Sequence, residues 1–383
     1  MKKQILIVGT GFSGMWAAVS AARLNALEGN NSLKIAVLAP APELRVRPRF
    51  YEENVTSLVS PLTGLFAELG IDFIAGKAEF IDIKGKSVSY RDANGVTAAV
   101  SYERLVLATG SQSKRPPIAG LAEYAFDIDQ LESAQTFEQH LDSLVSRPST
   151  AARNTVVVCG GGFTGIELAT ELPARLRARF GDDTATRIIV VERGHVIGGR
   201  YSEALRNTIE DASQELGIEW RLNSEIEAID ANGVTLKNGE RIPAATVVWT
   251  AGVEANPLGQ QINGERDNQG RLKVTETLQV PAHPDVYATG DMAYARTDEM
   301  GNTALMTCQH AIQLGKFAGH NAAASLLNRT PYPYRQVNYV TCLDLGAWGA
   351  VYTEGWDQAV KSVRDDAKKI KIAITNELIY PPA

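Results

Sequence analysis

ILIVGTGFSG, residues 5–14, is the stretch of this 383-residue chain that decides its fold. An apolar run, Ile5–Val8, is followed at once by Gly9, Gly11 and Gly14 in the spacing G-x-G-x-x-G, and then by a helix-forming run that ends near Leu27. Glycines at these places give a tight turn, a close backbone approach to a phosphate, and close packing of helix on strand. The helix N-terminus then presents N–H groups to that phosphate. The pattern predicts a βαβ unit that binds a dinucleotide.

The device occurs a second time at residues 155–165, TVVVCGGGFTG, with Gly160, Gly162 and Gly165 in the same places. The next predicted strand, 187–192, ends in Glu192. A carboxylate there accepts hydrogen bonds from ribose hydroxyls and repels a 2′-phosphate, which favours NADH over NADPH. The strand of the first unit ends without an acid, at Leu38-Ala39-Pro40, and Glu43 is a candidate replacement.

Later strands complete the organisation. Asp291 follows the predicted strand 286–288 and precedes a predicted helix at 305–327. A carboxylate there suits either the ribityl chain of a flavin or a simple helix cap. Short alternating segments from Ile71 to Val100, including Ile71–Ala75, predict an antiparallel meander. The sequence therefore predicts an α/β protein with two Rossmann-like, three-layer domains, the second inserted into the first, and a small C-terminal region.

The chain resembles the FAD-dependent pyridine-nucleotide oxidoreductases, and among them the type II NADH:quinone dehydrogenases. The resemblance covers residues 1 to about 325 and rests on these strings: ILIVGTGFSG, YERLVLATGS, VVVCGGGFTGIELATEL, VVERG, VVWTAGVEANP, DVYATGDMAY and CQHAIQLG. It implies an FAD domain at residues 1–115 and 253–327, a nicotinamide domain at 116–252, and a C-terminal region at 328–383.

The resemblance also implies site residues. FAD contacts are expected at Gly9, Gly11, Phe12, Ser13, Gly14, Arg47, Ala78, Thr109, Gly110, Gly290 and Asp291. NADH contacts are expected at Gly160, Gly162, Gly165, Glu192 and Gly252. Glu167 matches the family's acid near the nicotinamide and the flavin edge, and an ordinary acid near a helix start is the alternative. Gln309 and Gln313 match two glutamines that line the path of a quinone, and residues four apart share a helix face.

Arg45, Arg47 and Arg49 alternate in a segment expected to be extended, where their side chains would point the same way. Three roles stay open for them: pairing with the FAD pyrophosphate, meeting an anionic acceptor, or plain solvent exposure.

The cysteines argue against a thiol relay. Cys159, Cys308 and Cys342 form no C-x-x-C or C-x-x-x-x-C pair, and the chain offers no metal-ligand spacing. We therefore expect no metal, and electrons that leave directly from the flavin.

Composition limits the partners. Charged residues number 38 basic and 44 acidic, a net charge of −6, with no basic stripe, so nucleic-acid binding is not expected. The few cysteines fit a cytoplasmic protein. Apolar residues recur at helical spacing in the tail, at Val360, Val363, Ala367, Ile370, Ile374 and Leu378. Packing on the protein or a homodimer partner is favoured for this stripe, and peripheral contact with the inner face of the membrane stays open.

Three functions compete. The first is an FAD-dependent NAD(P)H dehydrogenase with a quinone-type acceptor. The second is a soluble reductase of a small redox protein or a pathway-specific oxidoreductase. The third is a nucleotide-sensing flavoprotein without turnover.

Overall fold

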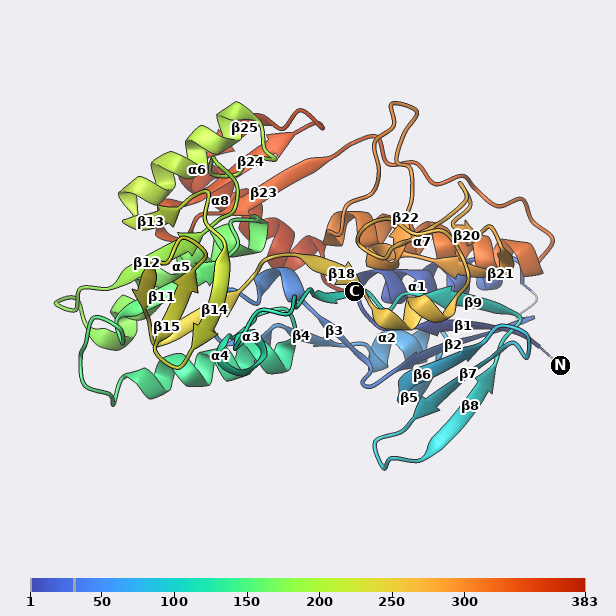
Figure 1. The fold of residues 1–383 in the computed structure, drawn as a ribbon. Helices are drawn as coiled ribbons and strands as arrows, with labels where there is room; N and C mark the ends of the chain where they lie inside the picture. The colour runs from blue at the N-terminus through green and yellow to red at the C-terminus, as the bar shows by residue number, and fades with distance from the viewer. Residues whose placement is uncertain (1, 30–31, 383) are drawn as a thin grey trace.

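A six-stranded sheet, parallel except at one edge, forms the centre of the first half of the molecule (Figure 1). The computed structural model describes residues 2–29 and 32–382. The order of strands in the sheet is β20 (Gln279–Val280), β21 (His283–Ala288), β9 (Arg104–Leu107), β1 (Lys3–Val8), β2 (Leu33–Ala39) and β5 (Asp72–Ala75). Strand β1 is buried from Ile5 to Val8 because both faces of the sheet are covered.

Two helices cover one face of this sheet and a three-stranded meander covers the other (Figure 1). The helices are α1 (Phe12–Leu27) and α7 (Cys308–Leu326), and the meander is β6 (Lys77–Asp82), β7 (Ser87–Arg91) and β8 (Thr97–Ser101). Helix α7 packs closely on the backbone of α1. Glycine at position 319 allows this, since a Cβ there would overlap the carbonyl oxygen of Ala17. The first unit therefore has three layers.

The expectation for Ile71–Ala75 was wrong. These residues do not belong to the meander: β5 pairs in parallel with β2 and forms the edge of the main sheet. Its residues are exposed or only partly buried, as at an edge, so β5 lacks the continuous apolar run of a central parallel strand.

The second unit has the same architecture, built around a four-stranded parallel sheet. The order is β13 (Ile218–Arg221), β12 (Arg187–Val191), β11 (Thr155–Cys159) and β17 (Thr246–Trp249). One face carries α4 (Leu131–Leu144) and α5 (Phe163–Phe180), and the other carries β14 (Ile226–Asp230), β15 (Gly233–Leu236) and β16 (Arg241–Pro243). This unit is inserted into the first, because β21 follows it in sequence and returns to the first sheet beside β9.

The two crossings between the units pair with each other. Strand β10 (Ser111–Ser113) leaves the first unit, β18 (Val253–Ala255) returns to it, and the two form an antiparallel pair. The boundaries placed after residues 115, 252 and 327 remain sequence-based predictions. The remaining short elements are β3 (Glu43–Arg45), β4 (Val59–Pro61), α2 (Thr63–Glu68), α3 (Leu121–Tyr124), β19 (Leu272–Lys273) and β22 (Ala293–Tyr294).

The C-terminal region is a three-stranded sheet followed by a helix. It comprises β23 (Val340–Asp344), β24 (Ala350–Glu354), β25 (Ala359–Val363), α8 (Arg364–Ala373) and a π-helical turn, Ile374–Leu378. The sheet packs on α5 and on α6 (Glu203–Glu215) through a cluster that includes Ile166, Ile209, Leu343 and Trp348. The C-terminal region therefore lies mainly against the second unit (Figure 1).

The prediction of one helical stripe from Val360 to Leu378 was wrong for its first two residues. Val360 and Val363 lie in β25, and the chain turns into α8 through Arg364, which has a left-handed φ of 61°. Apolar residues three apart fit a helix, but here the helix starts only at Arg364, and the acidic pair Asp365 and Asp366 stabilises its first turn.

Candidate active site

A cavity of about 1760 Å³ lies between the two units and is lined by both glycine turns. Most of the expected site residues line it: Gly9, Gly11, Phe12, Ser13, Arg47, Ala78, Thr109, Gly110, Asp291, Gly160, Gly162, Glu167, Glu192, Gly252 and Gln309. Gly14, Gly165, Gly290 and Gln313 are not among the lining residues. A cavity of this size between parallel sheets is the usual place for a ligand in such folds.

The first glycine turn combines a packing glycine with an open one. Gly9 has a φ of 111°, and a Cβ on Gly14 would overlap the carbonyl oxygen of Gly9. A Cβ on Gly11 would meet nothing within 4 Å, and Gly11 faces the cavity. Helix α1 has no side-chain cap and no acid in its first turn, so its N-terminus suits an anion in this space.

The second turn has the same construction. Gly160 has a φ of 115°, Gly165 packs on the carbonyl oxygen of Gly160, and Gly162 has open space in front of it. Glu192 lies at the end of β12, where its Oε2 accepts from the Gly161 N–H at 2.8 Å and its Oε1 from the Gly194 N–H at 2.7 Å. These two bonds fix the carboxylate at the rim of the cavity.

Asp291 belongs to a partly buried hydrogen-bonded group. The Ser111 hydroxyl donates to its Oδ2 at 2.6 Å, and Arg47 Nη1 donates to the Ser111 hydroxyl at 2.8 Å. Arg47 also pairs with Asp129. Burial raises the pKa of Asp291, and Arg47 and Ser111 oppose this rise. The carboxylate is therefore held at the cavity wall by a cation and a hydroxyl.

The expected common direction of the three arginines was wrong. Only Arg45 is in a strand, and residues Arg47–Arg49 form a short 3-10 helix with Pro48 near its start. Their partners differ as a result: Arg45 pairs with Glu43 and Glu132, Arg47 with Asp129 and Asp291, and Arg49 with Glu52. Glu43, the candidate replacement for the missing ribose acid, lines the cavity.

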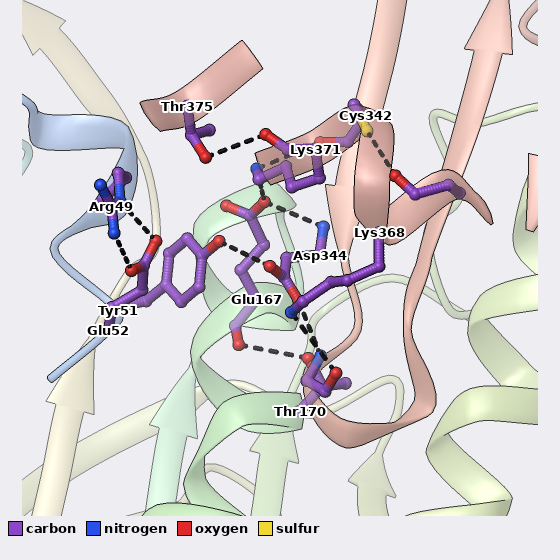
Figure 2. Close-up of polar contacts among 12 residues, drawn as sticks. Arg49, Tyr51, Glu52, Glu167, Thr170, Cys342, Asp344, Lys368, Lys371 and Thr375 are labelled. Carbon is purple, nitrogen blue, oxygen red and sulfur yellow. Dashed lines mark hydrogen bonds and ion pairs between the residues drawn. The ribbon is translucent and has the colours of Figure 1, made fainter. Parts of the chain in front are cut away.

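Glu167 lies at a junction of three parts of the chain (Figure 2). It projects from α5, and its Oε1 accepts from Lys371 Nζ of α8 at 2.6 Å and from the Asp344 N–H at the end of β23 at 3.1 Å. Tyr51, from the first unit, donates its hydroxyl to Asp344 Oδ2 at 3.0 Å. The side chains of Glu167 and Lys371 are each only 7% exposed, yet both line the cavity.

The electrostatics of this junction follow from its burial. Burial raises the pKa of Glu167 to about 7, although Lys371 opposes the rise. Burial alone would lower the pKa of Lys371, but Glu167 and Asp344 hold it above its ordinary value. Near neutral pH the junction therefore contains a fixed ammonium group and a carboxyl group that can gain or lose a proton.

The sequence did not identify Lys371, Tyr51 or Asp344 as site residues. Tyr51 and Asp344 carry no motif. Lys371 had one usable signal: it stands four residues after Ala367, on the same face of α8, and both side chains are buried. A lysine on a buried helix face needs a partner, which here is Glu167.

The two glutamines do not share one environment. Gln309 lines the cavity, and its Nε2 donates to the Val340 carbonyl oxygen at 2.6 Å. Gln313, one turn along α7, does not line the cavity.

All three cysteines are free thiols, and each lines the cavity. Burial raises the pKa of Cys159 to about 12 and those of Cys308 and Cys342 to about 11. Because the thiolate is the reactive form, these side chains are poor nucleophiles at neutral pH.

Aromatic side chains from three segments also line the cavity. Phe163 opens α5 and packs edge-on against Tyr201 at 6.2 Å between centroids. Tyr339, from the segment before β23, stacks on Trp356 at 4.6 Å. Phe163, Tyr201 and Tyr339 all line the cavity, which gives it an apolar wall beside Glu167.

Comparison with known proteins agrees with this geometry. The family model described as pyridine nucleotide-disulphide oxidoreductase matches residues 3–315. The chain belongs to this family. A protein named NADH dehydrogenase-like from Mycobacterium tuberculosis is 39% identical over 385 residues, covering 99% of this chain and 94% of the relative.

Two further matches extend the comparison. A demethylphylloquinone reductase from Synechocystis is 30% identical over 358 residues, covering 91% of this chain and 86% of the relative. The structure of NDH2 from Plasmodium falciparum in complex with NADH has a TM-score of 0.80 at 13% identity and covers 100% of this chain and 95% of that one. The last match concerns the fold only.

Family membership implies FAD and a pyridine nucleotide, so the chain is an NAD(P)H–flavin oxidoreductase. The residues present fit both groups. The open spaces at Gly11 and Gly162 are cradles that a Cβ would fill, and the buried Thr109 hydroxyl beside the first cradle has no partner among residues 2–29 and 32–382. The expected fold class, family and pair of cofactor types are thereby confirmed.

Proposed function

We propose that this oxidoreductase takes hydride from NADH onto FAD and passes the electrons to a quinone-type small molecule without a thiol intermediate. The observation that carries the proposal is the Glu167–Lys371 pair, a buried acid and ammonium in the wall of a cavity that both nucleotide turns also line. Relatives named for NADH and for a quinone support the choice of donor and acceptor.

Two nucleotide sites divide the cavity in this proposal. Gly9, Gly11, Thr109 and Asp291 would hold FAD, and Gly160, Gly162, Glu192 and Gly252 would hold NADH. Gly14, Gly165 and Gly290 would act behind them by allowing close packing. Bound FAD supplies the ring that accepts hydride and releases electrons singly or in pairs.

The task of the protein's own residues in this proposal is to supply a proton to the acceptor. Reduction of a quinone by NADH consumes one proton besides the hydride, since NADH, a proton and the quinone give NAD⁺ and the hydroquinone. Glu167, with its pKa raised to about 7, can give that proton and recover it from solvent. Lys371 stays charged and can donate a hydrogen bond to the acceptor oxygen. Gln309, which lines the same cavity, is the proposed further contact of the acceptor.

The preference for NADH rests on Glu192. Its carboxylate is held by two backbone N–H groups, so it cannot turn away from a 2′-phosphate. In Glu192→Gln we expect the KM for NADH to rise by about tenfold, the effect of losing a charged hydrogen bond, and the discrimination against NADPH to fall. Stopped-flow reduction of the flavin by each nucleotide measures both, with the exposed Glu227→Gln as control.

The acceptor is tested with the purified, FAD-loaded protein. After reduction by NADH, rapid re-oxidation by menadione or a short-chain ubiquinone is the expected result. If no quinone re-oxidises the flavin while a small iron–sulfur protein does, the acceptor assignment is wrong and the protein is a redox-protein reductase. Slow re-oxidation by every acceptor would instead mark a nucleotide sensor.

We further propose that the protein works in the cytoplasm and meets its acceptor at the inner face of the membrane. None of the helices in residues 2–29 and 32–382 combines the length and apolar character needed to cross a membrane. Ile372 is 47% and Leu378 71% exposed in the C-terminal region. Liposome flotation of the wild type and of Ile372→Ser/Leu378→Ser tests this contact, and sedimentation of the same pair tests whether these residues join a homodimer instead.

A further inference from the structure

A second ion pair, Asp344 with Lys368, lies beside Glu167 (Figure 2). Asp344 Oδ1 accepts from Lys368 Nζ at 2.6 Å and from the Gly346 N–H at 2.9 Å. Its other oxygen accepts from the Tyr51 hydroxyl, and its own N–H donates to Glu167 Oε1. Asp344 therefore contacts Glu167 through its backbone and faces it with a negative charge.

The two pairs differ in their access to solvent. Glu167 and Lys371 line the cavity, whereas Asp344 and Lys368 do not. The side chain of Asp344 is 6% exposed and that of Lys368 is 30% exposed. Asp344 is thus not part of the cavity lining, and Lys368 pairs the buried carboxylate with a partly exposed ammonium group.

The groups that face Glu167 come from every element packed against it. They are Lys371 from α8, Asp344 and Cys342 from β23, Cys308 from α7, Tyr51 from the first unit and Tyr201 from the segment before α6. Glu171, one turn along α5, faces Asp344 and Lys368 instead. Burial is the main reason that the pKa of Glu167 is raised; the Asp344 carboxylate adds to the rise and the Asp344 N–H opposes it. Asp344 is the nearby carboxylate whose own charge is paired by a lysine at 2.6 Å.

We propose that Asp344 and Lys368 are positioning residues that set the proton affinity of Glu167. The Asp344 N–H fixes the Oε1 of Glu167, and the Asp344 carboxylate favours the protonated form of Glu167 by repulsion. Lys368 limits that repulsion by neutralising Asp344. The inference rests on the proposed function of Glu167 as the group that supplies a proton to the acceptor.

Two substitutions should shift the pKa of Glu167 in opposite directions. Asp344→Asn keeps the size and the N–H but removes the negative charge, so the pKa of Glu167 should fall. Lys368→Met leaves the Asp344 charge unneutralised, so the pKa of Glu167 should rise. The charge of one nearby ionised group shifts the pKa of a carboxyl group by about one pH unit. A merely structural role would not give opposite signs.

Two readouts report the shift. One is the pH profile of flavin re-oxidation by menadione in the FAD-loaded enzyme. The other needs no turnover: the infrared band of the protonated carboxyl group, titrated with pH and assigned by its loss in Glu167→Gln. Lys369→Met is the matched control, because Lys369 is exposed and pairs with Asp366 on the outer face of α8. It should move neither readout.

The outcomes separate this inference from the function on which it rests. If Glu167→Gln leaves the pH profile of re-oxidation unchanged, the proposed proton-supplying role of Glu167 is wrong. Suppose instead that Glu167→Gln removes the pH dependence of re-oxidation. If Asp344→Asn and Lys368→Met then shift the pH profile in the same direction, or do not shift it, only the positioning role is overturned. Should Asp344→Asn not fold, Lys368→Met still decides, because its side chain is partly exposed: a rise supports the inference and no rise overturns it.

Discussion

Glu167 is a carboxyl group whose surroundings are assembled from segments far apart in sequence. Lys371 is 204 residues away and Asp344 is 177 residues away, yet both bond to the same oxygen. A position in an α5 motif could be recognised from the sequence. Its partners could not, because no local pattern links α5 to the end of β23 or to the buried face of α8.

The protonation of Glu167 should make flavin re-oxidation depend on pH. With the pKa of Glu167 raised to about 7, its protonated fraction falls as the pH rises through neutrality. If that proton goes to the acceptor, the rate of flavin re-oxidation by menadione should fall over the same range. Glu167→Gln should lose this dependence and slow re-oxidation by on the order of 10²-fold, a usual contribution of a positioned acid. Stopped-flow re-oxidation from pH 5.5 to 8.5, chosen to span about one and a half units on either side of neutrality, measures both.

The control for that prediction is Glu210→Gln, an exposed acid on α6. It should keep the wild-type profile. A profile that stays pH-dependent in Glu167→Gln would assign the titration to another group and contradict the prediction.

At the scale of the element, the glycine turns were predictable because each glycine answers a local steric demand. A strand, a tight turn and a helix must meet within six residues, and only glycine meets the positive φ of Gly9 and the close packing at Gly14. The short edge strand β5 and the start of α8 were not predictable in the same way. Their residues are partly exposed, so the apolar pattern does not distinguish the alternatives.

The turns give a second prediction, which separates folding from binding. Gly14→Ala places a Cβ on the Gly9 carbonyl oxygen and forces α1 away from β1, so it should lower the free energy of unfolding by about 1–3 kcal/mol. Gly11→Ala has open space in the protein alone and should unfold like the wild type without FAD. Its Cβ would occupy the proposed phosphate position, so FAD should bind at least about tenfold more weakly. Denaturation of the apoprotein and FAD titration give the two quantities. Equal stability of both apoproteins, or normal FAD binding by Gly11→Ala, would contradict the assignment of this turn.

At the scale of the whole molecule, the insertion of one dinucleotide unit into the other follows from the order of strands along the chain. The role of the C-terminal region cannot be predicted from that order, because this region contacts both units. Its sheet packs on α5 and α6, Lys371 reaches Glu167, and the Tyr380 hydroxyl lies 3.4 Å from Arg49 Nη1 in the first unit. Arg175 of α5 also donates to the Tyr51 carbonyl oxygen at 2.6 Å. The last residues of the chain thus help to join the units around the cavity.

Gly346 tests this joining role. It has a φ of 59°, and a Cβ there would overlap the carbonyl oxygen of Thr170 on α5. Gly346→Ala therefore combines a left-handed backbone cost of about 1–2 kcal/mol with a clash between the C-terminal sheet and α5. Gly355→Ala, at a φ of 80° in the turn after β24, carries the same kind of backbone cost but meets only the flexible Asp357 side chain.

We expect Gly346→Ala to lose more stability in thermal unfolding than Gly355→Ala. Because Asp344 and Lys371 move with the C-terminal sheet, Gly346→Ala should also shift the pH profile of re-oxidation. Gly355→Ala should lose stability alone. If both variants lose the same stability and keep the wild-type profile, the C-terminal region is only a covering layer and does not position the residues around Glu167.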